Sequence, residues 1–440
     1  MEKKIEEYTV FPFAQLGVPY LFVKNLAAAG IFDPKPVQMQ AIPPMLDGQD
    51  LLGISQTGSG KTLAFILPIL AHILAVGGKR EPKTVRALIL APTRELAVQI
   101  QESVHLVAKN AHFSISLVLG GVSRFAQIKR MLAGVDILIA TPGRLLDHVR
   151  EKNINLSQTR FLILDEADRM LDMGFVRDIR QITKLVSSNR QTALFSATMP
   201  KEIVHLAKSL LSDPVVLETA PQGMTVAEIT QRVYNVPIRD KKRVLAGLLG
   251  CPHFRSVIVF TRTKHGADSV TRYLEKVGFP VGVIHGNKSQ RARQCALKDF
   301  RDGRIQVLIA TDIAARGIDV PGISHVVNYE FPDEAESYIH RIGRTGRNGA
   351  LGDATTLYDE RVERARLHAV EKVIGRRLES EALPALPPVT FFDKTSISQD
   401  KLKLLKFSGK SATAHDAVRK EAAKKNVKKR SARAHFAKVV

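Results

Sequence analysis

Residues 161 to 170 read FLILDEADRM, in which four apolar residues are followed directly by three carboxylates within four positions. A continuous apolar run of this length is typical of a strand buried on both faces, as in a parallel sheet. Asp165 and Glu166 would then follow the carboxyl end of that strand, the edge at which open α/β sheets bind ligands. The alternative is a solvated acidic turn leading into a helix, because helix N-termini favour negative charge.

Similar apolar runs alternate with helical patterns on both sides of this stretch. Between about residues 35 and 217 they are DLLGIS (50–55), RALILA (86–91), SISLVLG (114–120), DILIAT (136–141), FLILDE (161–166) and TALFSAT (192–198). The alternation resumes with SVIVFT (256–261), VGVIHG (281–286), IQVLIAT (305–311), HVVNYE (325–330) and DATTLY (353–358). We therefore expect an α/β protein with two lobes, each a parallel sheet covered by helices on both faces.

The domain boundaries follow from changes in composition. Pro and Gly in TAPQGMTVAEITQ suggest a linker at 219–230, between a first lobe at 41–218 and a second lobe at 231–380. Residues 1–40 form an N-terminal segment, and the Pro-rich ALPALPPVTFF marks a last segment at 381–440.

The charge of the chain is strongly basic. Its net charge is +22, and residues 401–440 contribute 13 Lys and Arg against two acidic residues. Such a tail cannot bury much surface, so we expect it to be disordered when free. An excess of this size is typical of proteins that bind a polyanion, most often nucleic acid. A soluble basic protein without such a partner is the alternative.

The remaining bulk features favour a cytoplasmic protein. Cys251 and Cys295 lie far apart, without the spacing of metal ligands, and are expected to be reduced thiols. The start, MEKKIEEYTV, has no apolar signal region. The longest apolar stretch, residues 63–76, is too short for a membrane span.

The strongest local motif is SQTGSGKT at 55–62, directly after an apolar run. It matches a P-loop apart from Ser55, where the general pattern has Gly. In such a loop, backbone N–H groups surround phosphate oxygens, Lys61 reaches the β and γ phosphates, and the Thr62 hydroxyl holds Mg²⁺. A P-loop site also needs an acid at a neighbouring strand end for Mg²⁺, and Asp165 supplies it. Glu166 can then accept a proton from the attacking water.

With the P-loop, DEAD at 165–168 and SAT at 196–198, the chain resembles the DEAD-box ATP-dependent RNA helicases. The resemblance extends from about Phe13 to residue 375 and includes nearly every motif of that family in order. The context DEADRMLDMGF is most similar to bacterial RhlE-like members. The resemblance implies two tandem RecA-like lobes joined by a short linker, followed by the basic tail.

The resemblance implies a nucleotide site on the first lobe. Gln38 resembles the glutamine that reads the adenine edge, and Phe13 stands where the family has its isolated aromatic. Ile31 and Lys35 depart from the family pattern, so adenine stacking is weaker or comes from Phe32. The implied cofactors are ATP and Mg²⁺, with Mg²⁺ at Thr62 and Asp165 and with Lys61, Asp165 and Glu166 catalytic. The nucleotide-binding residues are Phe13, Gln38, Ser55, Gln56, Thr57, Gly58, Ser59, Gly60, Lys61, Thr62 and Asp319.

The resemblance also implies RNA contacts on both lobes. Thr93 and Thr141 precede expected helix starts, whose free N–H groups bind phosphates. Taken alone, each of these strings is an ordinary helix cap. The implied RNA-binding residues are Pro92, Thr93, Arg94, Gly120, Gly121, Thr141, Gly143, Arg144, Arg262, Gln290, Arg293 and Thr311.

The string HRIGRTGR at 340–347 resembles the family's last catalytic motif, with a solvated basic turn as the alternative. Arg344 and Arg347 resemble arginine fingers, which offset charge on the transferred phosphoryl group. The residues implied to couple ATP and RNA are Asp168, Ser196, Thr198, Asp312, His340 and Arg341.

These features favour an RNA-dependent ATPase that unwinds short RNA duplexes or remodels RNA–protein complexes. RNA would be bound through its backbone and 2′-hydroxyls, largely independently of sequence. Ribosomal precursors and RNA-decay proteins are compatible partners. A DNA-directed translocase and an RNA annealing or clamping factor that acts mainly through the basic tail are the alternatives.

Overall fold

The computed structural model describes residues 11–55, 58–218, 229–315, 320, 322–346 and 352–388. The predicted disorder of the basic tail therefore concerns a segment outside the described residues. The same holds for four predicted site residues: Gln56, Thr57, Asp319 and Arg347.

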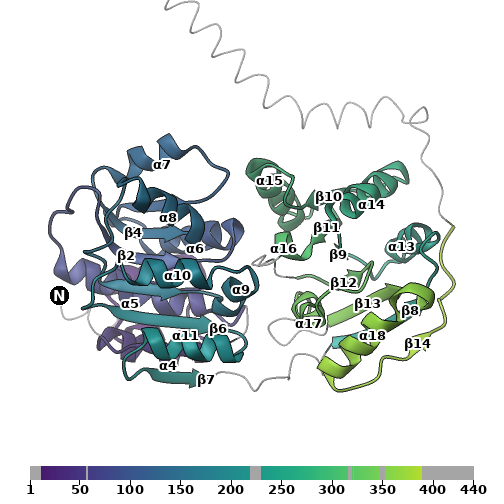
Figure 1. Ribbon diagram of the computed structural model, residues 1–440, viewed down its shortest axis with the longest axis horizontal. Coiled ribbons are helices and arrows are strands. Elements are labelled where there is room, and N and C mark those ends of the chain that lie inside the picture. The colour runs from purple at the N-terminus through teal and green to yellow at the C-terminus, as the bar shows by residue number, and fades with distance from the viewer. Residues whose placement is uncertain are drawn as a thin grey trace, which may run out of the picture. The chain divides into compact units, whose positions relative to one another are not determined.

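The first lobe is a seven-stranded sheet with the order β3-β4-β2-β5-β6-β1-β7, and every pair of neighbouring strands is parallel (Figure 1). Its strands are β1 (Leu51–Ile54), β2 (Val85–Leu90), β3 (Ile115–Val118), β4 (Val135–Ala140), β5 (Phe161–Leu164), β6 (Gln191–Ser196) and β7 (Val215–Glu218). Its helices are α2 (Pro12–Gln15), α3 (Tyr20–Ala28), α4 (Pro36–Leu46), α5 (Lys61–Val76), α6 (Arg94–Val107), α7 (Arg124–Met131), α8 (Pro142–Arg150), α9 (Ala167–Asp172), α10 (Val176–Thr183) and α11 (Lys201–Leu210).

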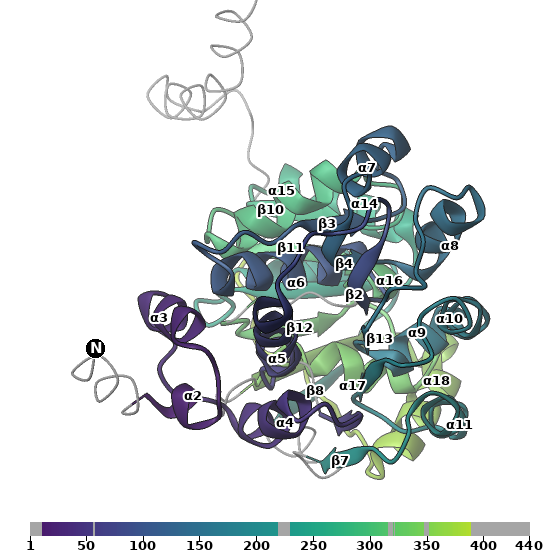
Figure 2. The ribbon, with the colours of Figure 1, turned by 90° about the vertical axis from the view of Figure 1, so that its left-hand side faces the viewer.

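Both faces of this sheet are buried, which explains the continuous apolar runs in the sequence. In β5, Ile163 belongs to the hydrophobic cluster on one face, whereas Leu162 and Leu164 belong to the cluster on the other. The first cluster includes residues of α2 to α6, and Figure 2 shows α2, α3 and α4 together on one side of the lobe. The second cluster includes residues of α8 to α11. The prediction of a parallel sheet covered on both faces is confirmed for this lobe.

The second lobe repeats the arrangement, with the strand order β10-β11-β9-β12-β13-β8-β14 and parallel pairing throughout. Counted from its own first strand, this order is the same as that of the first lobe. The strands are β8 (Ile229–Asn235), β9 (Val257–Thr261), β10 (Val281–Ile284), β11 (Val307–Thr311), β12 (His325–Asn328), β13 (Gly352–Tyr358) and β14 (Ser380–Glu381). The helices are α13 (Lys241–Leu249), α14 (Lys264–Lys276), α15 (Gln290–Arg301), α16 (Asp312–Ala315), α17 (Glu336–Ile342) and α18 (Glu360–Ile374).

Three predicted boundaries need correction. The helix α4 runs through the expected boundary between residues 40 and 41. The expected linker, 219–230, ends too late, because Ile229 already pairs with β13 as the first residue of β8. The second lobe does not end at residue 380, since β14 pairs with β8 and Leu386 lies against Gly247 of α13, where a Cβ atom would be 2.9 Å from that of Leu386.

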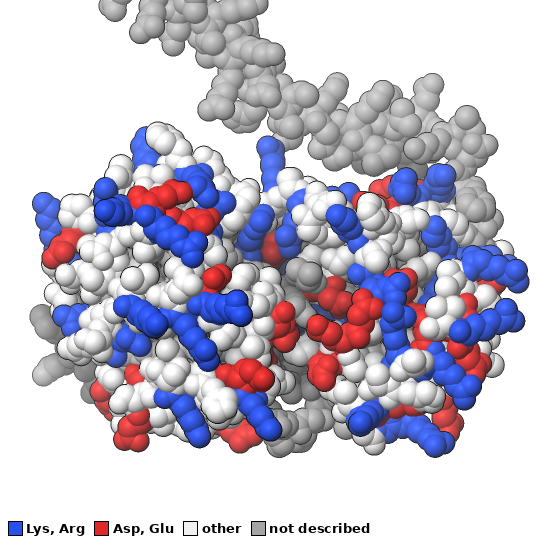
Figure 3. All heavy atoms as spheres, viewed as in Figure 1, with Lys and Arg blue, Asp and Glu red and all other residues white. Residues whose placement is uncertain are grey.

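On the face drawn in Figure 3, Lys and Arg side chains are interspersed with Asp and Glu over both lobes. This distribution agrees with a net charge that is concentrated in the tail, where residues 401–440 alone have 13 basic and two acidic side chains. Among the described residues, no helix is long and apolar enough to cross a bilayer.

Candidate functional site

The predicted motifs of the first lobe follow six neighbouring strands at one edge of the sheet. From β3 the order is GG after β3, TPGR after β4, PTRELA after β2, DEAD after β5, SAT after β6 and the P-loop after β1. Because the strands are parallel, all six carboxyl ends lie along the same edge. The three expected RNA motifs are therefore adjacent to one another, and so are the P-loop, the DEAD motif and the expected coupling motif SAT.

The P-loop turns sharply into α5 at two glycines in the left-handed region. Gly58 has φ of 88° and Gly60 has φ of 97°, a region that residues with a side chain rarely adopt. The Lys61 ammonium is buried and donates to the Ser55 carbonyl at 2.6 Å. Lys61, Thr62, Asp165 and Glu166 all line one cavity.

The two carboxylates after β5 are buried and short of partners. Asp165 Oδ1 and Glu166 Oε2 have no hydrogen-bond partner, although both residues are at least 96% buried. Burial raises the pKa of Asp165 to about 7, against the opposing effect of the Lys61 ammonium. Glu166 has φ of 56° and ψ of 56°, an uncommon conformation for a residue with a side chain that is found most often at functional sites. The solvated acidic turn is therefore excluded as a description of this segment.

The Asp165 oxygen without a hydrogen bond allows a test of whether the residues fit Mg²⁺. A hard cation takes oxygen ligands, and buried carboxylates are costly unless they are paired. Asp165 Oδ1 is such an uncompensated oxygen, and the Thr62 hydroxyl lines the same cavity. The donor set fits a magnesium ion.

Asp168 joins the DEAD and SAT motifs. Its Oδ2 accepts hydrogen bonds from the backbone N–H groups of Ala197 and Thr198, at 3.1 and 2.9 Å, and from the Thr198 hydroxyl at 3.1 Å. In return, Ser196 Oγ accepts from the Asp168 N–H at 3.3 Å. The three predicted coupling residues of the first lobe thus form one hydrogen-bonded unit between β5 and β6.

The residues expected to lie around adenine contact other groups of the first lobe in this structure. Gln38 Oε1 accepts from the Lys35 N–H at 2.8 Å, and its Nε2 donates to the Gly60 carbonyl at 2.9 Å. These two bonds leave one N–H proton and one oxygen lone pair of the Gln38 amide for other partners. Reading of the adenine edge by Gln38 therefore stays a prediction. Phe13 is only 1% exposed and belongs to the hydrophobic core, and its contact with the nucleotide stays a prediction. Lys35 donates instead to the P-loop carbonyl of Gly58 at 3.1 Å.

The three expected RNA motifs of the first lobe are in contact with one another. Thr93 caps α6 by accepting from the Leu96 N–H at 3.2 Å, and Thr141 is the N-cap of α8 without a side-chain bond. Arg94 lies directly over the glycine pair, because a Cβ atom on Gly121 would collide with its guanidinium. The predicted helix starts are confirmed.

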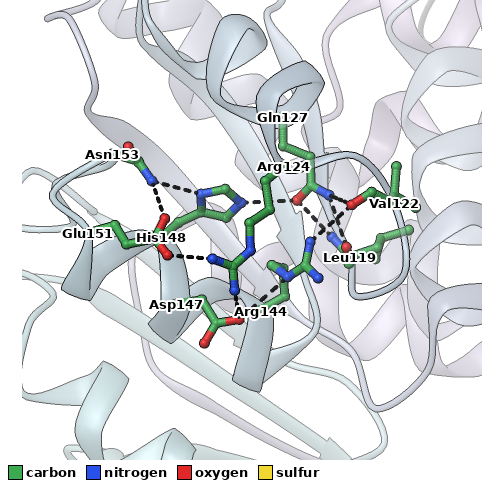
Figure 4. A network of polar contacts seen from close by, with 9 residues as sticks. All are labelled: Leu119, Val122, Arg124, Gln127, Arg144, Asp147, His148, Glu151 and Asn153. Atoms are coloured by element: carbon green, nitrogen blue, oxygen red, sulfur yellow. Dashed lines mark hydrogen bonds and ion pairs between the residues drawn. The ribbon is translucent and has the colours of Figure 1, made fainter.

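Arg144 completes this group in a network shown in Figure 4. Its Nη1 donates to the Val122 carbonyl at 3.1 Å, and its Nε faces Asp147 at 3.5 Å. Two buried residues that the sequence reasoning missed, Gln127 and His148, lie at the centre of the same network. An isolated Gln or His within an amphipathic helix gives no signal in a single sequence.

On the second lobe, the expected RNA contacts again follow three adjacent strands. Gln290 and Arg293 lie on α15 after β10, Thr311 ends β11, and Arg262 follows β9. The backbone N–H of Arg262 donates to Glu330 Oε2 at 2.9 Å, which fixes the turn after β9.

Arg341 organises the rest of the second lobe's site. It donates through Nε and Nη2 to both oxygens of Asp312, at 2.6 and 2.7 Å, and through Nη1 to the Glu330 carbonyl at 2.6 Å. Its guanidinium lies 5.2 Å from the Phe260 ring centroid. One turn further along, Arg344 Nε donates to the His340 carbonyl at 3.3 Å. The two predicted coupling residues Asp312 and Arg341 are therefore bonded to each other.

Arg169 is a further residue that the sequence reasoning missed. It is 3% exposed, its Nε lies 3.4 Å from Glu166 Oε2, and its Nη1 has no hydrogen-bond partner. The spacing of three residues between Glu166 and Arg169 at a helix start could have indicated this ion pair.

Comparisons with known proteins agree with this geometry. The model of the DEAD/DEAH box helicase family matches residues 35–206, and that of the helicase conserved C-terminal domain matches residues 240–349. The chain is 40% identical over 372 residues to the ATP-dependent RNA helicase CshA of Listeria monocytogenes, covering 84% of this chain and 70% of that one. It is 43% identical over 350 residues to a probable ATP-dependent RNA helicase, ddx17, of Dictyostelium discoideum, covering 79% of this chain but only 45% of that one.

Among solved structures, S. cerevisiae Dbp5 bound to RNA and ADP BeF3 matches with a TM-score of 0.74 and 32% identity. The match covers 84% of this chain and 96% of that one. The tandem RecA-like fold is thereby confirmed. Both family models, the curated relatives and the solved structure agree, and the chain belongs to the family of DEAD-box ATP-dependent RNA helicases.

Proposed function

We propose that this chain hydrolyses ATP in an RNA-dependent manner and uses the cycle to unwind short RNA duplexes or remodel RNA–protein complexes. The observation that carries the proposal is the order of motifs along the first sheet: the three expected RNA motifs occupy adjacent strand ends, next to those of the DEAD motif, the coupling motif SAT and the P-loop. One rigid edge can therefore hold both ligands side by side. The solved structure of Dbp5 with RNA and ADP BeF3 supports this pairing of ligands.

The nucleotide half performs the hydrolysis. The P-loop amides and Lys61 hold the phosphates, and Thr62 and Asp165 would hold Mg²⁺, which would neutralise phosphate charge when it is bound. Glu166 accepts a proton from water as the water oxygen bonds to the γ-phosphorus. The bond to the β–γ bridging oxygen breaks at the same centre, giving ADP and phosphate.

The RNA half binds the backbone of one strand. Helix N-termini at Thr93 and Thr141 present free N–H groups to phosphates, and Arg94 and Arg144 add positive charge. None of these groups reads a base edge, so binding is tolerant of sequence. Contacts to 2′-hydroxyls would favour RNA over DNA.

The second lobe supplies the remaining groups. Arg344 and Arg347 offset charge on the γ-phosphoryl group, while the Arg341–Asp312 pair holds the neighbouring RNA contact Thr311 in position. Because the catalytic set is divided, hydrolysis requires the lobes to close around ATP and RNA together, and each ligand then favours binding of the other. Closure that bends one strand would separate a short duplex.

Steady-state ATP turnover without nucleic acid, with single-stranded RNA and with DNA of the same sequence tests the proposal. RNA should stimulate turnover strongly and DNA should not; equal stimulation by both would favour a DNA-directed translocase. Strand displacement on a short RNA duplex should require ATP. ATP-independent annealing without RNA-stimulated turnover would favour the annealing or clamping factor.

Ribosomal precursors and RNA-decay proteins are partners compatible with this proposal. The kinship with RhlE-like members and a cytoplasmic location remain proposals drawn from the sequence.

A further inference from the structure

Gln127, on α7, is directed at the backbone of the loop that contains the glycine pair. Its Nε2 donates to the Leu119 carbonyl at 2.9 Å and to the Val122 carbonyl at 3.4 Å, and its Oε1 accepts from the Leu119 N–H at 3.2 Å. One amide therefore bonds both ends of the segment 119–122, with Gly120 and Gly121 between them (Figure 4). The side chain is 4% exposed, so these bonds are shielded from water.

His148 links the Gln127 amide to α8, the helix that carries Arg144. Its Nε2 lies 3.2 Å from Gln127 Oε1, and its Nδ1 lies 3.3 Å from Asn153 Nδ2. The imidazole is fully buried and stands one helical turn after Arg144 on α8. The His148–Gln127 contact therefore connects α8 to α7 beneath the two expected RNA motifs.

The hydrogen-bond directions in this chain of groups are fixed. The Leu119 N–H and carbonyl determine which end of the Gln127 amide is oxygen and which is nitrogen. Gln127 Oε1 is thus an acceptor, so His148 must donate through Nε2 and accept through Nδ1. Asn153 Nδ2 also donates to Glu151 Oε2 at 3.0 Å, which fixes the Asn153 amide in turn. His148 is held as the neutral Nε2–H tautomer.

We propose that Gln127 and His148 are positioning residues for RNA: they hold the glycine loop and the start of α8 in the relative geometry that one RNA backbone requires. This inference rests on the proposed function, because it assigns the glycine loop and Arg144 to RNA. Two other side-chain bonds hold α8 near this loop: Arg144 donates to the Val122 carbonyl, and Arg124 at the start of α7 donates to Asp147 of α8 at 3.2 Å. Both of these bonds are open to solvent, whereas the Gln127–His148 pair is buried.

The test measures RNA affinity, the KM for RNA, kcat at saturating RNA and ATP affinity in the full chain. Gln127→Met keeps the side-chain shape but removes the amide. It should weaken RNA binding and raise the KM for RNA about five- to tenfold, the effect of losing one or two buried hydrogen bonds. Both kcat and ATP affinity should stay within about twofold. Gln158→Met, in the exposed turn before β5, is the matched control and should change nothing.

A pair of substitutions at His148 separates positioning from packing. His148→Leu removes the donor and should weaken RNA binding about threefold, whereas His148→Gln offers an N–H near Nε2 and should restore affinity. The double variant Gln127→Met with His148→Leu should resemble Gln127→Met alone, because both act through one amide.

Three results would overturn the inference. They are unchanged RNA affinity in Gln127→Met, an equal loss of ATP affinity and kcat in that variant, and equal effects of Leu and Gln at position 148. A wild-type chain whose ATP turnover does not respond to RNA would instead refute the proposed function, so the two failures are distinguishable.

Discussion

At the scale of single residues, the site depends on groups that are buried without a full set of partners. Asp165 Oδ1, Glu166 Oε2 and Arg169 Nη1 are shielded from solvent and lack hydrogen-bond partners. Buried polar atoms of this kind are costly in a chain selected only for stability. The sequence could predict the two carboxylates, because they follow an apolar strand. The spacing of Glu166 and Arg169 indicates an ion pair, but the burial of Arg169 depends on the turn that Glu166 makes and could not be predicted.

Glu166→Gln should nearly abolish ATP turnover while ATP and RNA binding are retained. The amide keeps the size of the side chain but cannot accept the proton of water, and removing a general base typically costs about 10²- to 10⁴-fold. Single-turnover hydrolysis at saturating RNA is the measurement. A loss smaller than about tenfold would move the general base to another residue.

Gly121→Ala should weaken RNA binding several-fold with little effect on ATP affinity. Gly121 has φ of 70°, and an added Cβ atom would displace the Arg94 guanidinium. Gly48→Ala is the matched control, since Gly48 has φ of 82° but nothing within 4 Å of the added atom. Binding titrations that show equal losses for the two variants would attribute the effect to backbone strain alone.

At the scale of elements, continuous apolar runs predicted every strand that is buried on both faces, including β2, β4 and β5 of the first sheet. No apolar run predicted β7, β8 or β14. Val216 of β7 is 59% exposed, and β8, next to the edge strand β14, contains exposed and half-buried polar residues among its buried ones. β14 has two residues, too few for any pattern. Strands that are covered on one side only could not be predicted from apolar content.

The free energy of unfolding should depend on pH through His148 on α8. Burial and the neighbouring Arg144 lower the pKa of His148, so the unfolded chain binds a proton more readily than the folded chain. The stabilisation that neutral His148 gives the folded state is complete at pH values above its ordinary pKa of 6.5. It is lost as the pH falls through the lowered pKa of the folded state. Burial also lowers the pKa of His325 on β12, so His325 adds to the same dependence of stability on pH.

Denaturant unfolding of wild type and His148→Gln between about pH 5 and 8 measures this dependence. The variant should lose less stability on acidification than the wild type. The slope of the free energy of unfolding against pH should be smaller still in the double variant His148→Gln with His325→Gln. Parallel curves for wild type and His148→Gln would contradict the assignment.

At the scale of the whole molecule, the two lobes share one strand order but carry different groups. The first lobe holds the P-loop and the acids, and the second holds Arg341 and Arg344. The division of the motifs between two α/β lobes could be predicted from the sequence, since most of the motifs directly follow an apolar run. The bonds within each lobe, such as Arg341 to Asp312, depend on side-chain geometry that no pattern encodes.

Deleting residues 393–440 should weaken RNA binding at moderate salt and leave RNA-saturated ATP turnover nearly unchanged. The tail region 401–440 has 13 basic and two acidic side chains, and each phosphate contact to a single strand contributes about −0.7 to the slope of log affinity against log salt. Affinity measured over a salt series should therefore have a slope flatter by several units after the deletion. Parallel lines for the two proteins would exclude the tail as an RNA tether.

Hydrolysis at the P-loop of the first lobe should require an arginine from the second lobe. This dependence is measured as kcat of Arg344→Ala at saturating ATP and RNA, with ATP affinity determined in parallel. We expect kcat to fall by at least about 10³-fold, the usual effect of removing an arginine finger, with ATP affinity nearly unchanged. Retention of turnover within about tenfold of wild type would contradict the claim, because the first lobe would then hydrolyse ATP without this arginine.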